Sequence, residues 1–178
     1  MKWAPFEYDG QVFDLSHLHP FDWRFLAPAG GKRPEREYKF CVIFSCHCFT
    51  KSNKGDGDIA SQLFYDCERE HRIFCFDRYE LSKQLPDIVR SLGDRRVYHT
   101  HHGNFFTVEL VDEAGQVQEY EVYFKASRAT RRGWLNLFVQ SAYMRDSKHG
   151  SSQPKKRKIR LDVIAYNTLN KKPINPPK

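Results

Sequence analysis

The chain has 178 residues and a hydrophobic content of 40%, which argues against disorder of the whole chain and allows one domain with a buried core. Its formal net charge of +7 at pH 7 favours an anionic partner, and RNA or another polyanion is the partner we expect. No stretch approaches the roughly 18 apolar residues of a membrane span, and the N-terminus lacks a signal-peptide core. We therefore expect a cytoplasmic protein without a membrane segment.

The first quarter of the sequence predicts two β-hairpins. An Asp-Gly pair at 9–10 supplies the positive-φ positions of a tight turn, so residues 6–13 are expected to form the first hairpin. Aromatic residues alternate with polar ones over 21–25, which is the period of a half-buried strand. Residues 38–49 include a run that is apolar on both faces, typical of a central strand. We expect these two strands to pair.

The middle of the chain predicts a loop and then a helix. Residues 51–58 are polar and contain glycine, which indicates a solvated loop. A helix is expected to begin at Asp77 as its N-cap and to stop at Gly93. Pro86 should either kink this helix or restart it as a first-turn residue. The predicted apolar face consists of Leu81, Leu85, Ile88, Val89 and Leu92.

The second half predicts an antiparallel meander with one packed face and one available face. In its third strand Tyr120, Val122 and Phe124 point one way and the intervening residues point the other way. The strand-like segments are 96–101, 104–111, 117–126, 134–144 and 158–166.

These segments together predict a single α+β domain over residues 1–178. It is built mainly from antiparallel sheet, with N-terminal hairpins, a central helix and a C-terminal β-meander. Residues 146–157 are expected to form a flexible basic loop and residues 167–178 an irregular tail. We find no internal repeat.

Thiol and imidazole groups gather in the first half of the chain. A structural zinc ion requires four such donors in a tetrahedron. No Cys-x-x-Cys pair occurs, so buried free cysteines are the favoured interpretation. The odd total of five cysteines argues against a closed disulfide framework and for a reducing compartment. The candidate metal ligands are Cys46, Cys48, Cys67, His71 and Cys75.

Polar side chains of the predicted meander form a candidate catalytic site. His99 and His101 project from one face of a strand end, and imidazole exchanges protons near neutral pH. If the strands pair in sequence order, Lys125, Ser141 and Tyr143 converge on the same face. Such a set suits a metal-independent ribonuclease, with a base for the 2′-hydroxyl and cations for the phosphorane. In the alternative interpretation Tyr143 covers the edge of the core, and the Ser141 hydroxyl forms hydrogen bonds within its own strand.

The segment 145–160 is strongly basic, with seven Lys or Arg residues and one acidic residue. A cationic loop neutralises phosphates without reading sequence, and a solvated loop with no ligand is the alternative. The candidate nucleic-acid-binding residues are Arg145, Lys155, Lys156, Arg157 and Lys158.

Four segments, 44–50, 77–82, 101–105 and 138–143, together resemble a family of uncharacterised bacterial proteins labelled stationary-phase growth adaptation proteins. This resemblance covers most of the chain and implies no mechanism. The expected helix followed by a meander also resembles, in topology, the barnase, colicin and RelE-type ribonucleases. The extra N-terminal strands depart from small RelE-type toxins, and no catalytic residue of that group maps onto this chain.

The sequence thus predicts a small basic protein that acts on or binds RNA, as a metal-independent, toxin-like ribonuclease. The alternatives are a non-catalytic module that binds nucleic acid or protein, and a zinc-stabilised structural domain. The chain lacks the phosphate-binding glycine loop, the Gly-x-Ser-x-Gly elbow, the His-Glu-x-x-His motif and the deaminase motifs. We expect no cofactor.

Overall fold

The computed structural model describes residues 2–30, 33–53, 61–68, 70–100, 103–111, 117–144 and 157–175, without the side chains of 61, 103–111, 117 and 118. The fold is α+β and mainly antiparallel, as the sequence predicts. The predicted loop at 51–58 and the predicted basic loop at 146–157 lie largely outside the described residues.

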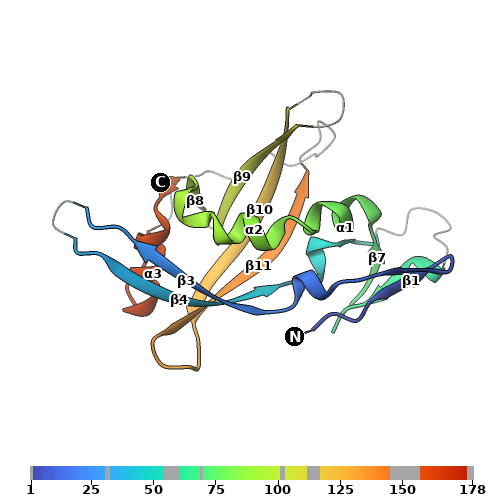
Figure 1. Ribbon diagram of the computed structural model, residues 1–178, viewed down its shortest axis with the longest axis horizontal. Coiled ribbons are helices and arrows are strands. Elements are labelled where there is room, and N and C mark those ends of the chain that lie inside the picture. Colours follow the sequence, from blue (N-terminus) through green and yellow to red (C-terminus); the bar gives the residue numbers. More distant parts are fainter. Residues whose placement is uncertain are drawn as a thin grey trace.

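A seven-stranded sheet with the order β12-β8-β9-β10-β11-β4-β3 forms the body of the molecule (Figure 1). All neighbouring strands are antiparallel except β11 and β4, which run parallel. The strands are β3 (Phe21–Ala27), β4 (Arg36–Phe44), β8 (Val97–Thr100), β9 (Gly103–Val111), β10 (Val117–Arg128), β11 (Trp134–Met144) and β12 (Arg157–Ile159).

The predicted pairing of the second hairpin is confirmed, because β3 and β4 are antiparallel neighbours. Alternate residues of β4 are buried, and so are their partners in β11, since a strand presents every second side chain to the same face. Phe40 lies opposite Leu135 and Val42 lies opposite Leu137, and all four side chains are buried. This pairing extends the buried core of the meander beneath the β3–β4 hairpin.

The predicted helix at 77–93 is two short helices, α1 (Phe76–Ser82) and α2 (Leu85–Arg90), followed by the 3-10 turn η4 (Leu92–Asp94). Pro86 lies in the first turn of α2, where its missing N–H costs no helical hydrogen bond. The restart that we considered for Pro86 is therefore correct. Cys75, and not Asp77, occupies the N-cap position of α1.

The predicted strand at 158–166 is wrong beyond its first residues. Strand β12 ends at Ile159, and residues 161–169 form the helix α3 (Leu161–Leu169). The buried side chains of Leu161, Ile164 and Ala165 follow helical spacing, and this helix packs across β10 and β11. Strand β12 pairs with β8 and so lies at the far edge of the sheet. The predicted irregular tail begins only after α3.

A smaller unit of short strands packs at one end of the molecule (Figure 1). The predicted hairpin at 6–13 is confirmed, with Asp9 and Gly10 at φ angles of 49° and 71°. Its Phe6 ring stacks on Phe74 at 4.0 Å, which joins the hairpin to the three-stranded sheet β5-β7-β6. The elements of this unit are β1 (Phe6–Tyr8), β2 (Gln11–Phe13), β5 (Thr50–Lys51), β6 (Phe64–Asp66), β7 (His71–Phe74), and the 3-10 turns η1 (Ser16–Leu18), η2 (Cys46–Cys48) and η3 (Ser61–Leu63).

Among the described helices, none has the length and apolar character required to cross a bilayer.

Gly93 allows η4 to pack closely against β3. A Cβ atom at this position would lie 2.5 Å from Cε2 of Phe25. The Phe25 ring packs against Trp23 and Tyr38, at centroid distances of 5.8 and 6.2 Å, so its freedom to move away is limited.

We expect Gly93→Ala to lower the free energy of unfolding by about 1–3 kcal/mol, because overpacking forces side-chain and backbone shifts. Urea unfolding measures this change. Gly30→Ala is the matched control, because a Cβ there meets nothing within 4 Å. Equal stability of the two variants would show that η4 and β3 do not pack as described.

Candidate functional site

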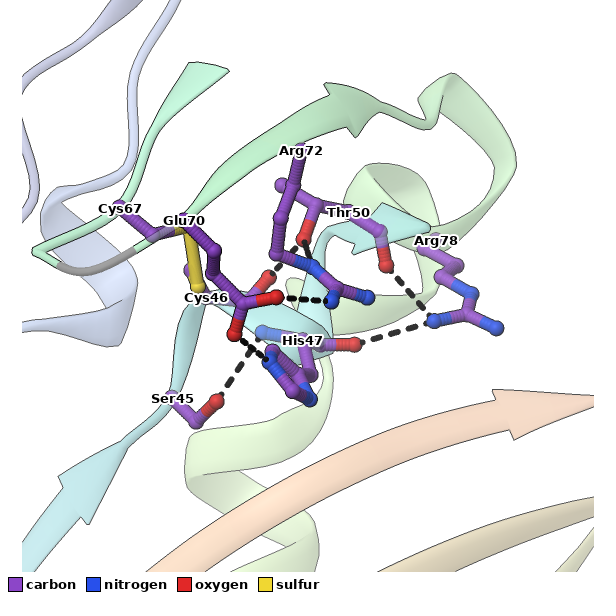
Figure 2. A network of polar contacts seen from close by, with 8 residues as sticks. All are labelled: Ser45, Cys46, His47, Thr50, Cys67, Glu70, Arg72 and Arg78. Atoms are coloured by element: carbon purple, nitrogen blue, oxygen red, sulfur yellow. Dashed lines mark hydrogen bonds and ion pairs between the residues drawn. A yellow bond between two sulfur atoms is a disulfide. The ribbon is translucent and has the colours of Figure 1, made fainter. Parts of the chain in front are cut away.

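The Cys-His-Cys segment forms the 3-10 turn η2, where the sequence predicted the end of a strand (Figure 2). The Ser45 hydroxyl accepts a hydrogen bond from the His47 N–H at 3.1 Å, which caps the turn. The Thr50 hydroxyl donates to the Cys46 carbonyl at 2.7 Å. These two side chains favour a turn over continued pairing, so Cys46 and Cys48 do not share a strand face.

Glu70 lies between His47 and Arg72 in the same network (Figure 2). One of its oxygens lies 2.9 Å from Nε2 of His47, and the other accepts a hydrogen bond from Nη1 of Arg72 at 2.8 Å. Arg72 is buried and also donates from Nε to the Thr50 hydroxyl at 2.8 Å. The hydrogen bonds from His47 and then Arg72 lower the pKa of the Glu70 carboxyl.

Arg78 completes the network from helix α1. Its Nη1 donates to the carbonyls of His47 at 3.2 Å and Thr50 at 2.7 Å, and its guanidinium lies 5.5 Å from the ring centroid of Tyr143. Burial lowers the pKa of Arg78. Arg78 therefore holds the backbone around η2, Arg72 holds the side chains of Thr50 and Glu70, and this network is structural in character.

A disulfide joins Cys46 to Cys67, with Cα atoms 6.4 Å apart. The favoured interpretation of buried free cysteines is therefore wrong for Cys46 and Cys67. An odd total excludes a fully paired set, but it does not exclude one bridge between two cysteines that the fold brings together.

The remaining candidate metal ligands do not assemble either. Cys48 is fully buried, its thiol donates to the Val139 carbonyl at 3.9 Å, and burial raises its pKa to about 12. Cys75 is half-buried, and His71 is exposed and pairs with Asp66. Within the described part of the chain, no group of three His, Cys, Asp or Glu side chains is placed to hold a metal ion.

Three of the predicted catalytic residues share one face of β10 and β11. Tyr143 lies opposite Glu121, and Ser141 lies opposite Tyr123. Lys125 follows two residues after Tyr123, so it points to the same side. The Tyr123 hydroxyl donates to Glu121 at 2.8 Å, and its ring stacks on Tyr143 at 5.7 Å. This face is thus polar and aromatic.

His99 does not join that face. The register aligns His99 with Asn104 of β9, and Asn104 with Phe124 of β10, whose side chain belongs to the buried core. Val97 belongs to the same buried core, and His99 follows it by two residues on β8, so His99 points to the core side and away from Lys125. Strand β8 also lies three positions from β11, about 14 Å at the usual strand spacing. His101, Arg145, Lys155 and Lys156 lie outside the described residues.

Two adjoining pockets, one between the edge strands β3 and β12 and one between the ends of β3 and β4 and helix α3, are together called the basic groove. The first, of about 530 Å³, is lined by four cationic residues, and the second, of about 370 Å³, by three. Both pockets share Pro28 and Asp162. The cationic residues are Arg95, Arg96, Lys158 and Arg160 in the first pocket, and Arg33, Arg36 and Lys172 in the second.

Asp162 lines both pockets and forms an ion pair with one arginine from each. Its carboxylate lies 2.9 Å from Nε of Arg160 and 3.4 Å from Nη1 of Arg33, and its side chain is 10% exposed. Among the residues that the structure describes, Asp94 is the only other acidic one that lines either pocket. The groove therefore carries seven cationic and two acidic side chains, which gives it a strongly positive potential.

The sequence identified only part of this groove. Lys158 was a predicted nucleic-acid-binding residue and does line it, and the neighbouring Arg157 donates to the Asn175 carbonyl at 2.6 Å. The other cations come from four segments of the chain, 33–36, 95–96, 160 and 172. Arg160 ends the basic segment 145–160, but no local charge run joins the other three segments to it, so the sequence did not indicate that they meet.

We expect reduction of the Cys46–Cys67 bridge to lower the free energy of unfolding by about 3 kcal/mol, because closing a loop of this length restricts the unfolded chain. Thermal melts with and without a dithiol measure the effect. Cys67→Ser should abolish the response, whereas Cys41→Ser, which changes a half-buried free thiol, should preserve it. A wild-type melt that is insensitive to the dithiol would contradict the bridge.

The lowered pKa of Glu70 predicts a pH-dependent contribution to stability. A carboxyl whose pKa is depressed by folding stabilises the protein above its unfolded pKa, and this contribution is lost as the pH falls through the folded value. Glu70→Gln should therefore be less stable than wild type at pH 7. The difference should shrink as the pH falls below about 4, near the usual Glu pKa. Urea unfolding at several pH values checks this, and Glu68→Gln is the control.

The model of the YjaZ family matches residues 5–169. Protein YjaZ of Escherichia coli (strain K12) is 34% identical over 179 residues, which cover 99% of this chain and 96% of that protein. No solved structure matches this chain. The resemblances to stationary-phase growth adaptation proteins and to the ribonuclease group, drawn from short segments and from topology, are corrected by these matches. The chain belongs to the YjaZ family.

Proposed function

We propose that this protein binds single-stranded RNA without cleaving it, with the phosphate backbone in the basic groove. The observation that carries the proposal is the gathering of seven cationic side chains around two joined pockets. Lysine and arginine side chains neutralise phosphates and release counterions, which supplies most of the affinity in sequence-independent binding. The net charge of +7 adds a long-range attraction.

The shape of the groove favours a single strand over a duplex. The groove is a concave site between two sheet edges, and it combines cations with apolar surface from β3. Leu26 is 57% exposed there, beside the half-buried ring of Phe25. Proteins that hold single strands combine a cationic track with apolar or aromatic platforms for the bases.

Binding is favoured over catalysis because the predicted catalytic set is divided. Lys125, Ser141 and Tyr143 share one sheet face, but His99 lies on the other face and on a distant strand. A general base must lie within hydrogen-bond reach of the proton that it removes. His99 therefore cannot act together with the other three residues on one phosphate.

We expect the protein to bind a fluorescent oligouridine, with an affinity that falls steeply as the salt concentration rises. Arg96→Glu combined with Lys158→Glu should weaken binding at least tenfold. The slope of log K against the logarithm of the salt concentration should become shallower by about 0.7 for each lost phosphate contact. Fluorescence anisotropy measures both quantities. The RNA should be recovered intact after incubation in EDTA.

Two further variants locate the binding surface. Lys51→Glu reverses one charge on the small sheet, away from the groove, where the groove variant reverses two, and it should leave the affinity near that of wild type. Lys125→Glu tests the polar and aromatic face of β10 and β11, where Lys125 is exposed. Loss of binding in Lys125→Glu with normal binding in the Arg96 and Lys158 variant would reject the groove and move the site to the sheet face.

A further inference from the structure

The second pocket of the basic groove has the form of a small-molecule site, and we call it the tyrosine pocket. The ends of β3 and β4 form one side, and helix α3 forms the other. Its volume of about 370 Å³ lies within the range of pockets that hold small ligands. Its apolar walls are formed by Ala27, Pro28, Pro34 and Val163.

The charges that line the tyrosine pocket do not balance. The described lining residues include three cations, Arg33, Arg36 and Lys172, and one carboxylate, that of Asp162, which is a surplus of two positive charges. Asp162 is also held by Arg160, which lines the neighbouring pocket, so its charge is shared with a cation from outside. A ligand that carries two negative charges would neutralise the surplus.

Tyr166 holds two of these cations in place. The guanidinium of Arg36 lies 5.3 Å from the centroid of the Tyr166 ring, and the ammonium of Lys172 lies 5.0 Å from it. The Lys172 ammonium also donates to the Tyr166 hydroxyl at 3.4 Å. Such cation–π contacts fix long, otherwise mobile side chains before a ligand arrives.

Tyr38 is a further polar group of the pocket. It is 5% exposed, and burial raises the pKa of its hydroxyl, so the hydroxyl keeps its proton at neutral pH. A protonated hydroxyl is a hydrogen-bond donor for an oxyanion. Asn167, one turn further along α3 than Val163, adds an amide to the same lining.

We propose that the tyrosine pocket binds a phosphomonoester whose organic group has the size of a nucleoside. Arg33, Arg36 and Lys172 would surround the phosphate. A phosphomonoester carries about −1.5 to −2 charges at pH 7, which matches the surplus, whereas a carboxylate carries one. The apolar walls and the volume accommodate more than a bare phosphate ion. This ligand is either a free nucleoside monophosphate or the phosphorylated end of an RNA strand in the groove, and the second source rests on the proposed function.

Calorimetry with three probes tests the ligand class. We expect AMP to bind, and adenosine and inorganic phosphate each to bind at least tenfold more weakly. Adenosine lacks the charged phosphate, and inorganic phosphate lacks the nucleoside. Equal binding of AMP and adenosine, or no binding of AMP to the wild-type protein, would overturn the proposal.

Matched variants test the residues. Lys172→Gln should weaken AMP binding at least tenfold, whereas Lys171→Gln, which changes the adjacent exposed lysine, should not. Tyr166→Phe keeps the ring and should bind AMP within threefold of wild type. Tyr166→Leu removes the ring and should weaken binding at least tenfold. If Lys172→Gln and Lys171→Gln bind AMP equally and both melt like wild type, AMP does not occupy this pocket.

A last comparison separates the two sources of the ligand. An oligouridine with a 5′-phosphate should bind more tightly than the same strand with a 5′-hydroxyl if the RNA end enters the pocket, and Lys172→Gln should abolish that preference. AMP binding without this preference assigns the pocket to a free nucleotide. AMP binding with no RNA binding at all rejects the proposed function and leaves the pocket assignment intact.

Discussion

The parallel pairing of β4 with β11 is the constraint on which the rest of the fold depends. It joins the β3–β4 hairpin to the C-terminal meander and aligns Phe40 with Leu135, so that one buried layer runs through both. Beyond β4, the Ser45 N–H donates to the Val139 carbonyl at 2.9 Å, and the chain then turns into η2. The same pairing thus determines where the smaller unit of short strands, which contains the Cys46–Cys67 disulfide, is attached to the large sheet.

The pairing also creates the basic groove, because it makes β3 the last strand of a sheet whose other edge is β12. Both edges line the first pocket, together with the residues that follow η4. Free sheet edges tend to pair with other chains, and charged residues at an edge oppose this. Lys158 serves this purpose on β12, and it is also among the cations that we assign to ligand binding.

Local signals predicted much of the fold. The Asp-Gly turn located the first hairpin, the alternation in β3 and β10 located these two strands, and the run of apolar residues located β4. The segment 158–166 was misassigned because its short strand runs directly into a helix, and Arg160 is the only residue between them. The Cys46–Cys67 bridge and the basic groove depend on long-range packing. Cys46 and Cys67 lie 21 residues apart in the sequence, and Arg33 and Asp162 of the groove lie 129 residues apart. Sequence spacing alone could not pair them.

The position of Asp162 between Arg33 and Arg160 has a thermodynamic consequence for the two pockets. An anion that draws Arg33 into the tyrosine pocket takes it from Asp162, and the carboxylate then interacts more strongly with Arg160. Arg160 becomes less available to the neighbouring pocket. Coupling of this kind is reciprocal, so occupancy of either pocket weakens affinity at the other, which is negative cooperativity within one short chain.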